Sequence, residues 1–145
     1  MKKVVSIFLA ALLMTSLMLV PAYAELDVGL YNSDYFSSYG TVLSNVGNCI
    51  IKIVFAADGT EICDEIGVAT FQVQRYDENG NWEDVTGMVV GETGENVVSY
   101  TFSKYFQGVL GERYRVQVTF VSYIDGSAEY KTYTSGVITA KQNRD

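Results

Sequence analysis

Hydrophobic and polar residues alternate along much of this chain, and the alternation is cleanest in residues 112–123. Every second residue from Tyr114 to Phe120 is apolar, and the residues between them are polar. A period of two, with β-branched and aromatic side chains, predicts a strand with one buried face. Such a strand needs partners to pair with and a second layer over its apolar face, so the pattern predicts a sheet packed on another sheet.

Six further segments have strand-like patterns: residues 39–44, 49–56, 69–76, 82–86, 97–102 and 130–140. Turn-forming residues separate them, and no segment has a helical period. Seven strands at this close and fairly even spacing predict an all-β fold, an antiparallel β-sandwich. A barrel with a similar number of strands is the alternative.

The same alternation predicts which side chains face the core. If Lys52 points outward, the second strand buries its alternate apolar residues. Those expected to face inward are Cys49, Ile51, Ile53 and Phe55 in the second strand, Ala69, Phe71 and Val73 in the third, and Val98, Tyr100 and Phe102 in the fifth.

The turns are predicted from composition. Asn79-Gly80 favours a two-residue hairpin because both positions accept a positive φ. Asp125-Gly126 marks another turn, and residues 45–48 and 87–96 also have turn composition. Residues 58–65 are interpreted as an acidic connection between the second and third strands.

Two motifs resemble those of known domains. The first is Phe106-x-Gly108-x-x-Gly111-x-x-Tyr114-x-Val116, which resembles the passage into strand F of immunoglobulin-like and fibronectin type III-like domains. In those domains a tyrosine near the strand start hydrogen-bonds back across the corner, and the resemblance implies this role for Tyr114. The second motif is Ile66-Gly67, then Phe71-x-Val73-x-Arg75-Tyr76, then Asn79-Gly80-x-Trp82.

Together, over residues 39–140, the motifs are similar to a group of small secreted proteins of Gram-positive bacteria. These proteins have one immunoglobulin-like sandwich after a signal peptide and are uncharacterised in function. The resemblance implies a seven-stranded immunoglobulin-like β-sandwich, with structural roles for Phe106, Gly108, Gly111, Tyr114, Ile66, Gly67, Gly80 and Trp82. The antibody pattern of paired cysteines around a tryptophan on strand C is not met, because the central strand has no cysteine.

The N-terminus has the pattern of a secretory signal peptide. Met1-Lys2-Lys3 is followed by an apolar run and then by Pro21-Ala22-Tyr23-Ala24. This pattern predicts cleavage after Ala24 and a secreted protein. A retained transmembrane anchor is the alternative reading, which the short apolar run disfavours. The expected organisation is a signal peptide (1–24), a loosely packed lead-in (25–38) and one β-sandwich domain (39–145).

The composition excludes several classes of function. The formal net charge is −7, and loss of Lys2 and Lys3 with the signal would make it more negative. Such a charge repels phosphate backbones and anionic membrane surfaces, so we expect neither nucleic acid nor membrane as a partner of the mature form. The chain has no histidine, which excludes histidine-based triads and imidazole metal sites.

Cys49 and Cys63 form an even pair, which in a secreted chain suggests a disulfide. Chain geometry favours two buried free thiols instead. If the second strand runs extended to Asp58, its length of about 30 Å exceeds the roughly 17 Å that the return to Cys63 can span. The bond would then require the strand to end near Phe55.

Several connections expected at one end of the sandwich carry carboxylates. These acids are Asp58, Glu61, Asp64, Glu65, Glu92, Glu95, Asp125 and Glu129. They could form a pole that binds a hard cation such as calcium, with Asp58, Glu61, Asp64, Glu65 and Asp125 as the candidate ligands, or that meets a basic partner. The alternative is that they only keep the loops solvated. Residues 77–88 do not match a calcium loop, since Trp82 occupies the position that needs glycine.

Four aromatic residues near the N-terminal end of the domain, Tyr31, Tyr35, Phe36 and Tyr39, could stack on sugar rings or could cap the core. Catalysis has little support, because Cys63 has no base beside it and short loops leave little material for a cleft. We therefore expect a non-enzymatic module without a cofactor that binds an extracellular protein. The alternative is a carbohydrate- or calcium-dependent cell-wall-binding module.

Overall fold

The computed structural model describes residues 33–142, and these residues form an antiparallel all-β structure without a helix. The predicted signal peptide and residues 25–32 of the lead-in lie outside the described part. Eight strands follow in order: β1 (Phe36–Asn45), β2 (Ile50–Tyr76), β3 (Trp82–Asp84), β4 (Val89–Val90), β5 (Thr93–Gln107), β6 (Arg113–Ile124), β7 (Ser127–Thr134) and β8 (Ile138–Thr139). Within residues 33–142 no helix is long and apolar enough to cross a membrane.

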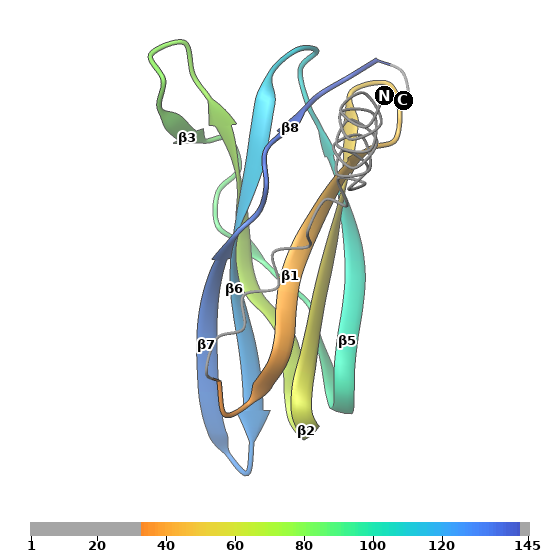
Figure 1. Cartoon of the computed structure of the whole chain (residues 1–145), viewed down its shortest axis with the longest axis vertical. Coiled ribbons are helices and arrows are strands. Elements are labelled where there is room, and N and C mark those ends of the chain that lie inside the picture. Colours follow the sequence, from red (N-terminus) through yellow and green to blue (C-terminus); the bar gives the residue numbers. More distant parts are fainter. Residues whose placement is uncertain (1–32, 143–145) are drawn as a thin grey trace, which may run out of the picture.

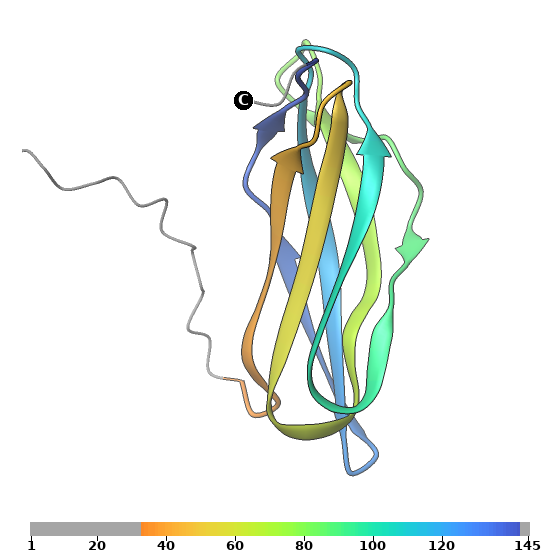
Figure 2. The ribbon, with the colours of Figure 1, turned by 90° about the vertical axis from the view of Figure 1, so that its right-hand side faces the viewer.

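β2 organises the sheet. It is 27 residues long, and its two ends belong to different parts of the molecule. Its first part, residues 50–59, pairs with β1 and β5, and its second part, residues 63–76, pairs with β6, β3 and β4. β5 also pairs with the start of the second part, from Cys63 to Gly67. β7 and β8 pair with β6. The sheet therefore runs β1-β2-β6-β7 and curls so that its two halves face each other (Figure 1, Figure 2).

The core lies between the two halves. Ile51, Ile53 and Phe55 of the first half are almost fully buried, and so are Val116 and Phe120 of the second. The Phe55 and Phe71 rings meet between the halves with their centroids 4.8 Å apart. The inward-facing residues predicted in 49–56 and 112–123 are thus confirmed, as is the outward direction of Lys52.

The strand boundaries differ from the prediction in the middle of the chain. The second and third predicted strands are one continuous strand, β2, and the acidic segment 58–65 belongs to it. The predicted last strand divides into β7 and β8, and β4 lies in a segment expected to be a turn. The described chain therefore has eight strands instead of the predicted seven.

Two predicted inward positions are wrong. The register of β2 against β6 shifts between Val68 and Thr70, so Val68 is buried in the core and Ala69 is only partly buried. Likewise, Val98 of β5 is exposed, and Val97 packs against the core instead. In both cases an irregularity in the pairing breaks the period of two that the sequence suggested.

Close backbone approaches near the bend of β2 require glycine. Gly67 has a φ of 155°, and a Cβ there would lie 2.4 Å from the carbonyl oxygen of Glu92. A Cβ at Gly59 would lie 2.5 Å from Cys63 Sγ. A larger residue at Gly67 would push residues 92–93 away from β2, and one at Gly59 would clash with Glu61 and Cys63 within the bend of β2 itself.

The hydrogen bond expected of Tyr114 is present. Its hydroxyl oxygen accepts the backbone N–H of Val109 at 2.9 Å, and its ring contacts Phe106 with centroids 5.2 Å apart. Gly108 lies against the same ring, where a Cβ would come within 3.1 Å of Tyr114 Cε2. The motif 106–116 therefore forms one packed corner between β5 and β6.

The described part of the predicted lead-in is packed and not loose. Phe36 begins β1 and is 3% exposed. Ser33 Oγ and the Tyr35 N–H both donate to the Glu129 carboxylate of β7, at 2.9 and 3.0 Å. These bonds link the two ends of the curled sheet, because β1 and β7 are the outer strands of its main path.

Candidate functional site

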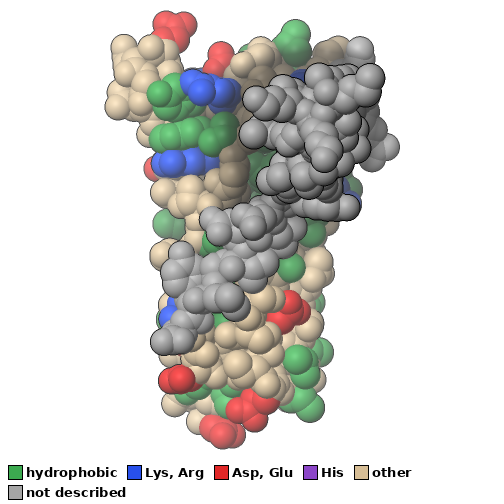
Figure 3. Space-filling model, viewed as in Figure 1, with side chains coloured by type: hydrophobic (Ala, Val, Ile, Leu, Met, Phe, Trp, Pro, Cys, Tyr) green, Lys and Arg blue, Asp and Glu red, His purple; other side chains and the backbone are tan. Residues whose placement is uncertain are grey.

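The predicted cation-binding pole does not form. Acidic side chains do gather at one end of the molecule, seen at the bottom of Figure 3. However, residues 33–142 contain no group of three or more acidic or cysteine side chains that could hold a metal ion. The reason is that residues 58–65 continue a strand, so successive side chains point to opposite faces.

Three of the candidate ligands already have protein partners. The Ser38 hydroxyl donates to Asp58, the Thr93 hydroxyl donates to Glu65 at 2.6 Å, and the Gly126 N–H donates to Asp64 at 3.4 Å. Of the other two, Glu61 is exposed on β2 and Asp125 is exposed in the β6–β7 turn. Of the remaining acids, Glu92 pairs with Lys104 and Glu129 with Lys131.

The two cysteines are free and buried, as the chain geometry favoured. Cys49 precedes β2, where its N–H donates to the carbonyl of Lys141 at 2.8 Å. Cys63 lies within β2 beyond the bend, and it accepts a hydrogen bond from the Ser122 hydroxyl at 3.3 Å. Each thiol is therefore enclosed in a separate part of the core, where it also makes weak hydrogen bonds: Cys49 Sγ donates to Gln142 Oε1 at 3.8 Å and Cys63 Sγ donates to the Glu61 carbonyl at 3.3 Å.

Of the four aromatic residues that could stack on sugar or cap the core, the three described ones form no open platform. Tyr39 packs on Phe36 and Phe120 with ring centroids 5.3 and 5.4 Å away, and Tyr35 packs against the core. Tyr31 lies outside the described residues. The core-capping alternative therefore describes Tyr35, Phe36 and Tyr39.

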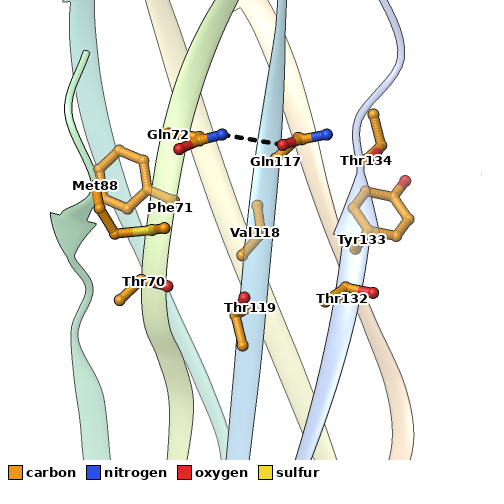
Figure 4. Close-up of a pocket in the computed structure, with 10 residues that line it drawn as sticks. All are labelled: Thr70, Phe71, Gln72, Met88, Gln117, Val118, Thr119, Thr132, Tyr133 and Thr134. Atoms are coloured by element: carbon orange, nitrogen blue, oxygen red, sulfur yellow. Dashed lines mark hydrogen bonds between the residues drawn. The ribbon is translucent and has the colours of Figure 1, made fainter. Parts of the chain in front are cut away.

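A groove of about 320 Å³ lies instead on the outer face of β2, β6 and β7 (Figure 4). Its floor consists of two transverse rows of uncharged polar side chains, one residue from each strand. One row is Thr70, Thr119 and Thr132, and the other is Gln72, Gln117 and Thr134. The strand register therefore places these hydroxyl and amide groups side by side on the outer face of the sheet.

Exposed apolar side chains flank the groove on the β4 side. Met88 lines it and is 68% exposed, and Val90 on β4 is 79% exposed. Val85 after β3 is also exposed. Met88, together with Val90, which lies opposite the floor residue Thr70, forms an apolar rim beside the polar floor.

A side-chain hydrogen-bond network extends from the floor toward β3. Gln72 Nε2 donates to Gln117 Oε1 at 3.0 Å and to Asp84 Oδ1 at 3.0 Å. Gln74 Nε2 donates to the same Asp84 oxygen at 2.8 Å, and Arg115 Nε donates to Gln74 Oε1 at 2.8 Å. The network fixes the amides and limits their freedom before any ligand arrives.

Beyond the network, two arginines of β6 stack on aromatic rings. The guanidinium carbon of Arg113 lies 4.0 Å from the Tyr76 ring centroid, and that of Arg115 lies 4.2 Å from the Trp82 centroid. The two rings pack on each other at 5.1 Å. Figure 3 shows Lys or Arg side chains alternating with hydrophobic ones near β3 and β8. We call this cluster of Tyr76, Trp82, Arg113 and Arg115 the arginine ladder.

The adjoining hairpin uses its own acidic residue. Asp77 Oδ1 accepts the N–H groups of Asn79 and Asn81 at 2.9 and 2.8 Å, and Gly80 has a φ of 84°. A turn is therefore present at Asn79-Gly80, but the predicted two-residue hairpin is wrong: Tyr76 pairs with Trp82 across a loop of residues 77–81, and of the two turn residues only Gly80 has a positive φ. Trp82 covers the sheet as expected.

The sequence interpretation missed the groove. Its floor residues are the polar members of the alternating patterns in 69–76 and 112–123, which were read only as the solvent-facing side. Their composition is the available signal, because Gln and Thr occupy positions where lysine and glutamate are common on exposed faces. Comparisons with known proteins found no matching family model, no matching curated protein and no matching solved structure.

Proposed function

We propose that the chain is a secreted, non-enzymatic immunoglobulin-like β-sandwich domain that binds an extracellular protein through the groove on β2, β6 and β7. The sandwich assignment is supported by the strand partners. β1, the first part of β2 and β5 lie in one half, and the second part of β2 lies with β6 and β7 in the other. Immunoglobulin-like domains distribute their strands over two sheets in a similar way. The N-terminal signal pattern supports secretion.

The groove is the observation that carries the binding proposal. A polar, uncharged floor beside an apolar rim suits a polypeptide, whose backbone offers hydrogen-bonding groups and whose side chains offer apolar contacts. Met88 is the residue best placed for such a contact, since methionine adapts to varied apolar surfaces.

A glycan is the competing ligand, because the Gln and Thr rows would also suit hydroxyl groups. Sugar rings bind through stacking on open aromatic faces. Two aromatic residues line the groove, and their rings pack on core rings: Phe71 on Phe55, and Tyr133 on Tyr39 and Phe120. The rings beside the network are Tyr76 and Trp82, and an arginine guanidinium group covers a face of each. This arrangement favours the protein ligand.

A display selection tests the proposal. The purified secreted chain would be screened in parallel against a random peptide library and a glycan array. Thr119→Arg fills the groove with a long charged side chain, whereas Thr101→Arg makes the same change at an exposed β5 position in the other half. We expect selected peptides to lose binding at least tenfold with Thr119→Arg and to keep it with Thr101→Arg.

Thermal melting of both variants would establish that each is folded before binding is measured. Peptide binding that tolerates Thr119→Arg would place the ligand elsewhere. Binding to glycans alone, sensitive to Thr119→Arg, would assign the groove to carbohydrate and reject the protein ligand.

A further inference from the structure

We propose that the arginine ladder selects an extended acidic segment of the protein partner, with carboxylates at every second residue contacting Arg113 and Arg115. This inference rests on the proposed function and specifies the chemistry of the ligand. The remainder of the segment lies along the groove floor, and an apolar side chain beyond the acidic residues contacts Met88.

The spacing of the two arginines predicts the spacing of the acidic residues in the ligand. Arg113 and Arg115 are alternate residues of β6, so both project from its outer face, about 7 Å apart along the strand. An extended peptide presents every second side chain on one side with the same repeat. Two acidic residues separated by one position therefore match the two guanidinium groups.

The guanidinium groups are held in place before binding. Each stacks on an aromatic ring, and Arg115 is further fixed by its bond to Gln74. A stacked arginine loses less side-chain freedom when it binds a carboxylate, and its planar fork suits bidentate contacts. Among the described residues, no hydrogen-bond acceptor is found for the Arg113 guanidinium, so its donors are free to bind a ligand.

Charge complementarity favours an acidic ligand at this face. Asp84 is the nearest carboxylate of the network, and it already accepts hydrogen bonds from Gln72 and Gln74. The ladder thus presents two cations on a protein whose formal net charge is −7. Two cations at one place on an otherwise acidic protein attract an acidic segment to that place and help to orient it.

The order of features along β6 sets the spacing of contacts along the segment. Arg113 and Arg115 come first, and Gln117 and Thr119 follow on the same face. A bound segment that begins at the ladder therefore reaches the groove and its Met88 rim within two to four further residues, at about 3.3 Å per residue. The expected ligand has two acidic residues separated by one position and an apolar residue a few positions away from them on one side.

The experiment uses peptides selected on the full secreted chain and the double variant Arg113→Gln/Arg115→Gln. Its matched control is Arg75→Gln, which also removes an arginine from this region but one that pairs with Glu83. We expect the selected peptides to be enriched in the acidic pattern and to bind the double variant at least tenfold more weakly. The Arg75→Gln variant should bind within about twofold of the wild type, and binding should weaken as salt rises.

Loss of binding to Thr119→Arg combined with full binding to the double variant would overturn the acidic ligand and leave the groove proposal intact. Selected peptides without acidic enrichment would overturn it as well. If the double variant unfolds, the single variants Arg113→Gln and Arg115→Gln replace it. Arg113 lies at the exposed start of β6, so Arg113→Gln should keep the fold and weaken binding at least threefold.

Discussion

Two single side chains make hydrogen bonds that tie separate parts of the chain together. Tyr114 supplies an acceptor for the Val109 N–H, and Glu129 accepts N–H and O–H groups of the segment before β1. A buried donor that loses its partner costs more than the bond itself gains. Substitutions of Tyr114 and Glu129 therefore test the corner between β5 and β6 and the attachment of β1, respectively.

Tyr114→Phe should lower the free energy of unfolding by about 1 kcal/mol, because the Val109 N–H would lose its acceptor while the ring packing remains. Chemical denaturation of the purified domain measures this. Tyr105→Phe is the control, since Tyr105 is 65% exposed, and it should change stability little. Equal stability of Tyr114→Phe and the wild type would contradict a structural role for the hydroxyl.

Glu129 should make stability depend on pH in the acidic range. Burial raises the pKa of its carboxyl, but hydrogen bonds from Lys131, Ser33 and the Tyr35 N–H outweigh burial and hold that pKa below its ordinary value. The folded state then binds this proton less readily than the unfolded state. The stabilisation by the Glu129 carboxylate is present above about pH 4.3, which is the pKa of glutamate in the unfolded state. It is lost as pH falls through the lower pKa of the folded state.

Glu129→Gln should therefore be less stable than the wild type at pH 7, and the gap should narrow as pH falls below about 4. Thermal melting from pH 7 to pH 3 measures this difference in stability between Glu129→Gln and the wild type. Glu95→Gln, at an exposed position, provides the baseline for removing one surface carboxylate. A gap that stays constant with pH would show that the Glu129 charge does not stabilise the folded state.

The strands show how much of the fold the alternating pattern of the sequence can predict. β6 was predicted almost to its ends, because both of its edges are paired and its inward residues follow a strict period of two. β2 was divided in two because residues 58–65 are acidic and contain Gly59, a composition typical of loops. The segment remains a strand because β5 pairs with β2 on both sides of the bend, with Ser99 opposite Asp58 and Val97 opposite Cys63. That pairing is long-range information which no local pattern contains.

Gly67→Ala should destabilise the domain by about 2 kcal/mol or more, because the new Cβ would collide with the backbone of residues 92 and 93 and the φ is unfavourable. Gly87→Ala is the matched control, since nothing lies within 4 Å of its Cβ position. It should change stability by less than about 1 kcal/mol. Comparable losses for the two variants would show that the contact between Gly67 and residues 92–93 is looser than described.

At the scale of the whole molecule, the all-β class and most inward-facing residues could be predicted, but the candidate site could not. The groove needs the register of Thr70 against Thr119 and of Thr119 against Thr132, and these residues come from three separate strands. The predicted cation-binding pole failed for a related reason. The sequence placed its acids at one end, yet their directions depend on whether the segment between them is a strand or a loop.

The two free thiols offer a measure of the stability of the whole structure. Cys49 and Cys63 are 6% and 0% exposed and lie in different parts of one core, so a thiol reagent should reach both only when the core opens. In native buffer we expect Cys63 to react at the rate of global unfolding, and in denaturant two thiols per chain should react at once. The melting temperature should be the same with and without reductant. A shift on adding reductant, or fewer than two thiols in denaturant, would show that the cysteines pair.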